Sequence, residues 1–163
     1  MHIIIRPATQ QDVQALGDMY YEFHEYHAAL VPTHLRSLGQ KDAWDRSRLL
    51  QALQDIFKNE DAMIFIAEVD GQSAGLIEVY VRQSDADPGV VPMCYIEMQS
   101  LMVLPAFRQH GIGRQLVDTA REWAKGKGAT EISLGVWESN QQAREFYERH
   151  GFVTLHRRMV MPV

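Results

Sequence analysis

The feature that most constrains the fold is a strand-like segment that runs through a loop with two glycines into an amphipathic helix. Residues 101–104 are apolar, and Gly111 and Gly113 follow them in the loop. Without a β-carbon, each glycine allows the backbone to bend sharply, to take positive φ and to approach a bound group closely. The apolar residues after the loop recur at helical spacing: Ile112, Leu116, Val117, Ala120, Trp123 and Ala124. A helix N-terminus offers free N–H donors and a positive dipole end, and Arg108 and Arg114 add positive charge. The loop therefore predicts a phosphate-binding site.

Two well-known phosphate-binding sequence patterns do not fit this loop. The dinucleotide pattern G-x-G-x-x-G requires a third glycine at the position of Leu116, and no G-K-[ST] follows as a P-loop would require. Two glycines by themselves are also typical of a tight turn that binds nothing. The interpretation therefore depends on the rest of the chain.

Length and composition limit the remaining possibilities. A chain of 163 residues, of which 46% are hydrophobic, fits one domain, residues 1–163, with a substantial core. It has neither an apolar run of about 18 residues nor a secretion signal at its start, so we expect a soluble cytoplasmic protein with no membrane partner. A net charge of −5 argues against nucleic acid as a partner. The single cysteine, Cys94, excludes an internal disulfide and a thiolate zinc cluster.

The hydrophobic pattern predicts secondary structure in the order βααβββαβαβ. Strands are expected at residues 3–7, 63–69, 74–82, 93–103, 131–136 and 152–161. The first helix is expected after Thr9, which can form a capping box with Asp12. The other helices are expected over residues 49–57, 112–126 and 140–151. The Asp70-Gly71-Gln72 sequence predicts a hairpin turn, which makes two of the strands an antiparallel pair.

Two motifs in this arrangement resemble the signatures of the GNAT N-acetyltransferase superfamily. The loop matches R-x-x-G-x-G at Arg108, Gly111 and Gly113. Residues 140–152 match the second signature as N-x-x-A-x-x-F-Y-x-x-x-G-F, at the expected distance after the loop. The start of the chain, residues 5–9, is also similar. The order of elements resembles the GNAT fold, an α/β domain of the α+β type with a mixed, mostly antiparallel sheet flanked by helices. The resemblance thus covers the whole chain.

This resemblance implies acetyl-CoA (coenzyme A) as the cofactor. The diphosphate would bind the glycine loop, backbone groups of Leu101 and Val103 would pair with the pantetheine arm, and an N–H near Leu101 would stabilise the oxyanion. Asn140 would bond the pantetheine or cap its helix. The cofactor-binding candidates are Leu101, Met102, Val103, Arg108, Gln109, His110, Gly111, Ile112, Gly113, Arg114, Asn140 and Tyr147. No Ser-His-Asp or Cys-His nucleophile is evident, so the acetyl group is expected to pass directly to the amine within a ternary complex.

Acetyl transfer to an amine also needs a proton donor and a proton acceptor. By the resemblance, Tyr147 would protonate the coenzyme thiolate, and a phenol with a pKa of about 10 keeps its proton at neutral pH. Glu97 is the first candidate for the base, because it is an acid in an otherwise apolar strand and matches the strand glutamate of histone-acetylating GNAT enzymes. Many GNAT proteins place this acid two residues later, where the chain has Gln99. Glu78 is the rival candidate, and a solvated side chain on a sheet face is the alternative for either glutamate.

The acceptor side is less defined by the sequence. Tyr26 and His27 are candidates for substrate binding, together with Glu78 and Glu97, because the first helical region shapes the acceptor pocket in GNAT relatives. The histidines and glutamates around residue 24 lack the H-E-x-x-H spacing, so no metal site is expected. The acceptor is expected to be an amine of a small molecule or a peptide. A homodimer is a possible state, since the family often dimerises through exposed strand edges.

Two other functions remain open from the residues alone. A catalytically silent acyl-CoA-binding sensor would need Gly111 and Gly113 but would tolerate the loss of Tyr147 and Glu97. A nucleotide-binding regulator would bind ATP or NAD in preference to coenzyme A. Because Tyr147 and Glu97 are both present, we expect an N-acetyltransferase.

Overall fold

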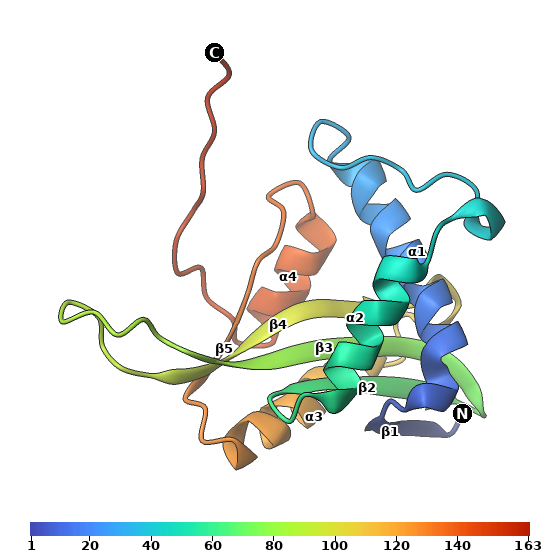
Figure 1. Cartoon of the computed structure of the whole chain (residues 1–163), viewed down its shortest axis with the longest axis horizontal. Coiled ribbons are helices and arrows are strands. Elements are labelled where there is room, and N and C mark those ends of the chain that lie inside the picture. Colours follow the sequence, from blue (N-terminus) through green and yellow to red (C-terminus); the bar gives the residue numbers. More distant parts are fainter.

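The computed structural model describes all residues, 1–163, and places helices on both faces of one sheet (Figure 1). The strands are β1 Ile3–Pro7, β2 Ala62–Val69, β3 Gln72–Gln83, β4 Cys94–Val103 and β5 Glu131–Leu134. The α-helices are α1 Val13–Leu30, α2 Ser47–Lys58, α3 Ile112–Gly126 and α4 Gln141–Arg149. Three short 3₁₀ turns, η1 Gln10–Asp12, η2 Lys41–Ala43 and η3 Pro105–Phe107, lie between them. None of the helices is both long enough and apolar enough to cross a membrane.

The five strands are ordered β1-β2-β3-β4-β5, as they are in sequence. The first three pairs are antiparallel and the β4–β5 pair is parallel, which confirms the predicted mixed, mostly antiparallel sheet. The predicted hairpin turn joins β2 to β3. Asp70 and Gly71 both have positive φ, 49° and 83°, as a two-residue turn of the primed type requires.

The sheet opens between β4 and β5. Only residues 95–98 of β4 pair with β5, so residues 99–103 have no strand beside them on that edge. On the other edge, Gln99 is an extra residue in the β3–β4 ladder, because Val79 is opposite Met98 and Glu78 is opposite Ser100. A β-bulge of this kind bends a strand and increases its local twist. The bulge lies at the position where β4 and β5 separate.

Each face of the sheet has its own hydrophobic core. Helices cover both faces (Figure 1). On one face, α1 and α2 bury Leu16 and Leu53 against strand residues that include Leu76. On the other face, α3 buries Leu116 and Ala120 against a set that includes Phe65, Ile77, Val79 and Ile96. Helix α4 also lies on this second face, but none of its residues is fully buried.

The predicted capping box begins the first helical region. Asp12 accepts hydrogen bonds from the Thr9 N–H at 2.7 Å and from the Arg6 guanidinium at 2.7 and 2.8 Å, and Arg6 also binds Glu68. The Thr9 hydroxyl oxygen accepts from the Gln11 N–H. The hydrogen bonds from Arg6 lower the pKa of Asp12 to about 2. These contacts fix the start of α1 against β1 and β2.

Replacing Asp12 with alanine should lower the free energy of unfolding by about 1–2 kcal/mol at neutral pH, the usual cost of losing a helix cap. Because the pKa of Asp12 is lowered from 3.8 to about 2, its contribution is present above pH 3.8 and is lost as the pH falls through 2. Urea unfolding at pH 7 and at pH 2 measures both effects, with the exposed Gln10→Ala as the control. If the free energies of unfolding of the wild type and Asp12→Ala differ as much at pH 2 as at pH 7, the carboxylate charge does not have the proposed role.

The predicted last strand, residues 152–161, is wrong for this structure. The chain has no regular secondary structure after Gly151, and every side chain from residue 153 onward is exposed. The observed order is therefore βααβββαβα. A strand forms only where its backbone groups find a partner edge. In Figure 1 the C-terminal segment runs away from β5 instead of along it.

Candidate active site

The glycine loop turns into α3 as the sequence predicts. Gly111 has φ of 75° and is the N-cap residue of α3, so a left-handed backbone conformation makes glycine the favoured residue there. The expectation of positive φ at Gly113 is wrong, because Gly113 lies in the first turn of α3 and only Gln109 and Gly111 in this loop have positive φ. Gly113 instead lies close to a neighbouring ring. A β-carbon on it would lie 3.3 Å from the Phe146 ring.

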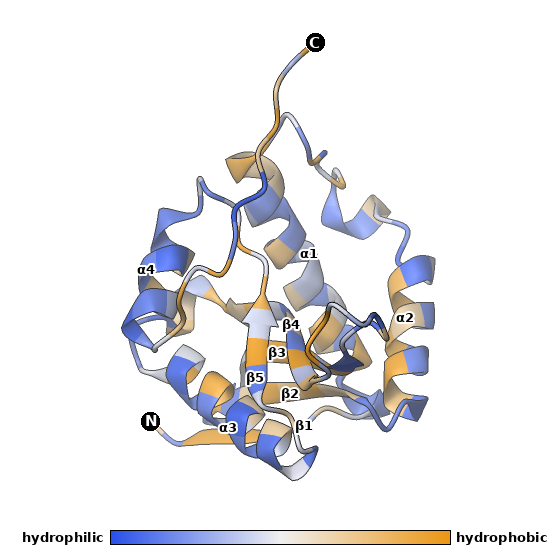
Figure 2. Ribbon diagram, turned by 90° about the vertical axis from the view of Figure 1, so that its left-hand side faces the viewer, coloured by the Kyte–Doolittle hydropathy of each residue, from blue (hydrophilic) through white to orange (hydrophobic).

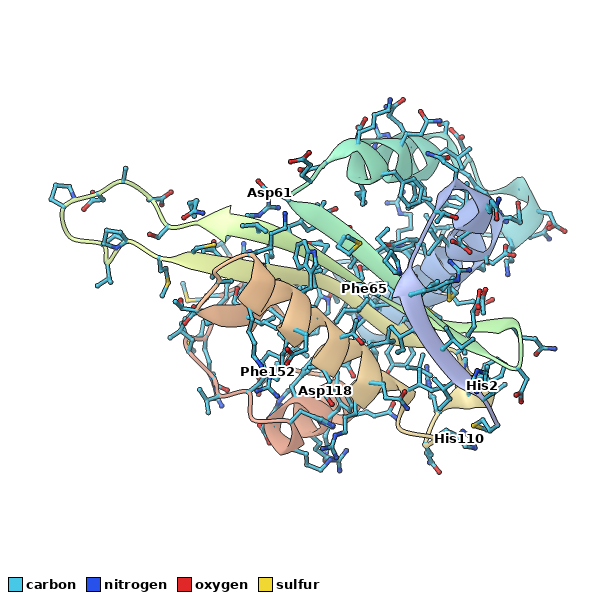
Figure 3. All side chains as sticks on the ribbon, turned by 90° about the horizontal axis from the view of Figure 1, so that it is seen from below. His2, Asp61, Phe65, His110, Asp118 and Phe152 are labelled. Atoms are coloured by element: carbon cyan, nitrogen blue, oxygen red, sulfur yellow. The ribbon has the colours of Figure 1, made fainter.

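The loop presents a row of free donors to one side. The amide N–H groups of residues 109–114 have no acceptor within the protein, since the first hydrogen bond of the helix runs from the Gln115 N–H to the Gly111 carbonyl at 3.1 Å. Arg108 and Arg114 lie at either end of this row, and Arg114 forms an ion pair with Asp118 at 3.6 Å. Figure 3 shows His110 at the outer end of the loop and Asp118 farther along α3. The arrangement has the donors and the positive charge that a phosphate group needs.

The free edge of β4 leads toward this loop. The Leu104 N–H donates to the Ala74 carbonyl at 2.8 Å, so the main-chain groups of Leu104 point toward β3. Alternate residues of a strand point to opposite edges, and the groups of Leu101 and Val103 therefore face the gap beside β5. The Val103 carbonyl accepts from Arg108 Nε at 3.0 Å, which agrees with this direction.

Two of the predicted cofactor-binding side chains are turned away from the gap. Met102 is buried in the core under α1 and α2, and Ile112 is buried in the core under α3. Of Ile112, only the main-chain N–H belongs to the row of free donors. Exposed Gln109 and His110 are placed in the loop itself.

Tyr147 lies on α4 between two aromatic rings. The ring centroids of Phe146 and Phe152 are each 5.5 Å from that of Tyr147, in edge-to-face geometry. Burial raises the pKa of Tyr147 to about 12. Its hydroxyl has no hydrogen-bond partner in the protein, unlike those of Tyr20, Tyr21, Tyr26 and Tyr80. A core tyrosine whose hydroxyl is satisfied internally, the alternative explanation for this residue, is not what the structure shows.

Asn140 begins α4 and is buried. Its Oδ1 accepts from the Ala143 N–H at 3.2 Å, which is the predicted helix cap. The same oxygen accepts from the Tyr26 hydroxyl at 3.3 Å, so α1 reaches α4 at this point. The Arg108 guanidinium lies 5.7 Å from the centre of the Tyr26 ring. Tyr26 therefore contacts residues from both signature motifs.

The two candidate base residues lie on the same face of the sheet, under α1 and α2, but in different surroundings. Glu97 is partly exposed and accepts a hydrogen bond from Arg82 Nε at 2.7 Å. Glu78 is buried, with three hydroxyl donors: Tyr20 and Tyr80 at 2.6 Å each and Ser100 at 3.0 Å. Glu78 is therefore not the solvated side chain that the sequence left open.

The hydroxyls around Glu78 keep their protons. Burial, and then the charge of Glu78, raise the pKa of Tyr20 well above its ordinary value. Burial and the hydrogen bond to Glu78 also raise the pKa of Tyr80. Both phenols thus stay donors to the carboxylate at any physiological pH.

The model of the acetyltransferase (GNAT) family matches residues 19–152, a range that contains the glycine loop, the open edge of β4 and the whole of α4. The chain belongs to the GNAT family. It is therefore an N-acetyltransferase, and acetyl-CoA is its acyl donor.

Individual GNAT relatives agree with this assignment. The uncharacterized N-acetyltransferase YhfO of Bacillus subtilis is 26% identical over 148 residues, which are 91% of this chain and 88% of YhfO. Aminoglycoside N(6′)-acetyltransferase type 1 of Salmonella typhimurium is 27% identical over 104 residues, 61% of this chain and 68% of that protein. The solved structure of AAC(6′)-Iy in complex with the bisubstrate analog CoA-S-monomethyl-acetylneamine has a TM-score of 0.77 at 20% identity. The match covers 100% of this chain and 99% of that one, and it shows a shared fold.

The remaining predicted residue of the GNAT acceptor side, His27, is held within α1. Its Nδ1 lies 2.8 Å from the Phe23 carbonyl oxygen, and its ring packs against Phe23 and Tyr26. No three histidine, cysteine, aspartate or glutamate residues come together as a metal site would require.

Sequence reasoning missed the four residues that contact the two candidate bases: Tyr20, Tyr80, Arg82 and Ser100. The sequence does contain a signal for Tyr80 and Arg82. Residues two apart in a strand share a face, and Glu78, Tyr80 and Arg82 follow one another at this spacing. For Tyr20 and Ser100 none exists, since α1 and β4 meet Glu78 only through the tertiary fold.

Proposed function

We propose that this GNAT protein transfers the acetyl group of acetyl-CoA directly to a primary amine of a small molecule, within a ternary complex. One observation carries the proposal. The protein has a row of free N–H donors at the start of α3, an edge of β4 without a neighbouring strand that leads toward that row, and a Tyr147 hydroxyl without a partner in the protein. The N–H donors would bind an anion, the β4 edge would pair with an extended, amide-containing chain, and the hydroxyl would donate a proton.

The residues present fit acetyl-CoA part by part. The N–H groups of residues 109–114, with Arg108 and Arg114, would hold the diphosphate. The main-chain groups of Leu101 and Val103 would pair with the amides of the pantetheine arm, as they would with an added strand. The bound thioester supplies an activated acetyl group.

The chain's own residues then have two tasks with protons. The neutral hydroxyl of Tyr147 would donate its proton to the departing sulfur, and its raised pKa ensures that the proton is present at physiological pH. Glu97 would accept the proton of the incoming ammonium group, directly or through water, because its carboxylate is partly exposed. We assign the base to Glu97 over Glu78, since hydroxyl groups engage both oxygens of Glu78.

The substrate class follows from the relatives and from charge. The sequence relative from Salmonella typhimurium acts on aminoglycosides by its name, which supports a polyamine-like small molecule as the acceptor. A net charge of −5 also favours a cationic acceptor, because an acidic surface attracts positively charged molecules.

A screen of amines with acetyl-CoA tests this function. Thiol release should depend on the amine, and mass spectrometry should find one acetyl group on the product. The panel contains aminoglycosides, linear polyamines, amino acids and short peptides. Acetylation of peptides alone would contradict the small-molecule assignment, and thiol release without an acetylated amine would contradict transfer. Steady-state kinetics that require a covalent acetyl-enzyme would contradict the ternary complex.

Replacing Glu97 with glutamine should lower turnover and remove the acidic limb of the pH–rate profile, because the variant has no carboxylate to deprotonate. The matched variant is Glu78→Gln, which changes the same group at the buried position on the same face. The pH dependence of kcat is measured for both with the best amine of the screen. An unchanged limb in Glu97→Gln together with its loss in Glu78→Gln would move the base to Glu78.

A further inference from the structure

Arg82, on β3, makes two contacts on the face of the sheet that carries α1 and α2. Its Nε donates to the Glu97 carboxylate at 2.7 Å, and its guanidinium carbon lies 4.8 Å from the centre of the Tyr80 ring. Tyr80 is directly opposite Glu97 in the β3–β4 ladder, so the ring and the carboxylate are neighbours on one face. A single positive group thus touches both of them.

This part of the face is open to solvent. Helices α1 and α2 pack mainly on β2 and β3, and Figure 2 shows α2 well apart from β5. The side chains of Arg82 and Glu97 are 45% and 39% exposed. A small molecule can therefore reach the Glu97 carboxylate if the Arg82 side chain alone moves.

The contacts of Arg82 are the ones that a cationic amine would need here. An alkylammonium group pairs with a carboxylate and is attracted to the face of an aromatic ring. If Glu97 takes a proton from the incoming ammonium, that group must come within hydrogen-bonding distance of the same carboxylate. A cation at the other carboxylate oxygen would still lie beside the guanidinium and be repelled by it. Arg82 and the acceptor therefore compete for one position.

Arg82 is also held weakly enough to be exchanged. Its side chain forms no hydrogen bond except the one to Glu97. Exposed ion pairs and exposed cation–π contacts each contribute little. Arg6 differs in this respect, because its guanidinium donates to both Asp12 and Glu68.

We propose that Arg82 occupies the ammonium subsite of the acceptor in the free enzyme, and that a cationic acceptor displaces it. This assignment rests on the proposed function, in which Glu97 is the base. Arg82 is then a residue that determines specificity, because an acceptor must bring its own positive charge to replace the one that leaves. The released guanidinium turns into solvent, to which it is already partly exposed.

Replacing Arg82 with alanine should lower the KM for the best amine of the screen about 3- to 10-fold and change kcat by less than about twofold. The two constants respond differently because Arg82 has already left the subsite once the amine is bound. Arg82→Lys keeps a cation beside Glu97 and should keep the KM of the wild type. A large fall in kcat at saturating amine would overturn the proposal, since Arg82 would then be needed to orient Glu97.

Lys125→Ala is the matched control for net charge. It removes one positive charge from a surface ion pair with Glu122 at 2.6 Å, on α3 and hence on the other face of the sheet. Its KM should equal that of the wild type. If both alanine variants lower KM equally, the amine responds to the overall charge of the protein and no displacement takes place.

Binding of methylguanidinium tests the subsite without turnover. Once the arginine side chain is removed, Glu97 and the Tyr80 ring should bind this ion, and ligand-observed magnetic resonance in the presence of coenzyme A should detect it with Arg82→Ala. The ion should not bind to the wild type, or to Arg82→Ala combined with Glu97→Gln. Absence of binding to Arg82→Ala, or equal binding to all three proteins, would refute the subsite. If no amine of the screen is acetylated, the proposed function fails, and this measurement still decides whether the subsite exists.

Discussion

Replacing Tyr147 with phenylalanine should lower turnover about 10²–10⁴-fold, the usual contribution of a positioned proton donor, while acetyl-CoA affinity stays nearly unchanged. The substitution removes one oxygen and keeps the ring, so the packing against Phe146 and Phe152 is retained. The hydroxyl has no partner inside the protein, so its loss leaves no buried group unsatisfied. Negative charge develops on the sulfur mainly as its bond to carbon breaks, so the missing proton is felt in the transition state and hardly in the ground state.

Two measurements on each protein make this result decisive: turnover with a competent amine, and acetyl-CoA affinity by calorimetry. Tyr21→Phe is the matched control, because the Tyr21 hydroxyl donates to the Gly39 carbonyl in the loop that follows α1, and the turnover of this variant should be near that of the wild type. With a pKa of about 12, Tyr147 should also cause no alkaline loss of turnover below pH 10. Full turnover in Tyr147→Phe would refute the acid role. A loss of both acetyl-CoA affinity and thermal stability in this variant would show that Tyr147 has a structural role.

Replacing Gly113 with valine should abolish acetyl-CoA binding. A valine side chain at this position would stand among the free N–H groups at the start of α3 and block the approach of a diphosphate to the backbone. Its β-carbon would also lie 3.3 Å from the Phe146 ring, so this side chain beside Tyr147 would have to shift. Both effects act on the cofactor side of the gap.

The control for this variant lies at the other end of the same helix. Gly126→Val adds the same side chain where a β-carbon meets nothing within 4 Å, and it should bind acetyl-CoA normally. Gly113→Ala, which adds one carbon, should bind more weakly than the wild type and more tightly than Gly113→Val. Calorimetry gives the affinities, and thermal unfolding shows whether each variant is folded. Unchanged affinity in a folded Gly113→Val would remove the loop from the cofactor site.

The parts of the structure that the sequence predicts well are those determined by neighbours along the chain. The capping box at Thr9 and Asp12, the turn at Asp70 and Gly71, and the cap at Asn140 each involve residues within a few positions of one another. The GNAT motifs are local in the same sense. The family, the fold class and the glycine loop were therefore accessible from residues alone.

What the sequence did not reveal depends on contacts between distant elements. Tyr20 is 58 positions from Glu78, and Tyr26 is 114 positions from Asn140, so no spacing rule connects them. The conformation of Gly113 was missed for a different reason, because a glycine can lie close to a neighbouring ring without positive φ. The last strand was predicted from a valid alternation, but a strand also needs an edge to pair with, and the pattern says nothing of where that edge is.

The unpaired edge of β4 affects how stable the protein is and how fast proteases degrade it. Without a ligand, the main-chain groups of Leu101 and Val103 face water or the Arg108 side chain, and the sheet is held together at that point by only four β5 residues. A ligand that pairs with this edge binds the folded state alone, so at 100 times its Kd it adds about 2.7 kcal/mol to stability by mass action. We therefore expect the melting temperature and the resistance to proteases to rise with acetyl-CoA concentration. In a cell, the amount of this protein would then follow the supply of its acyl donor, through degradation of the unliganded fraction.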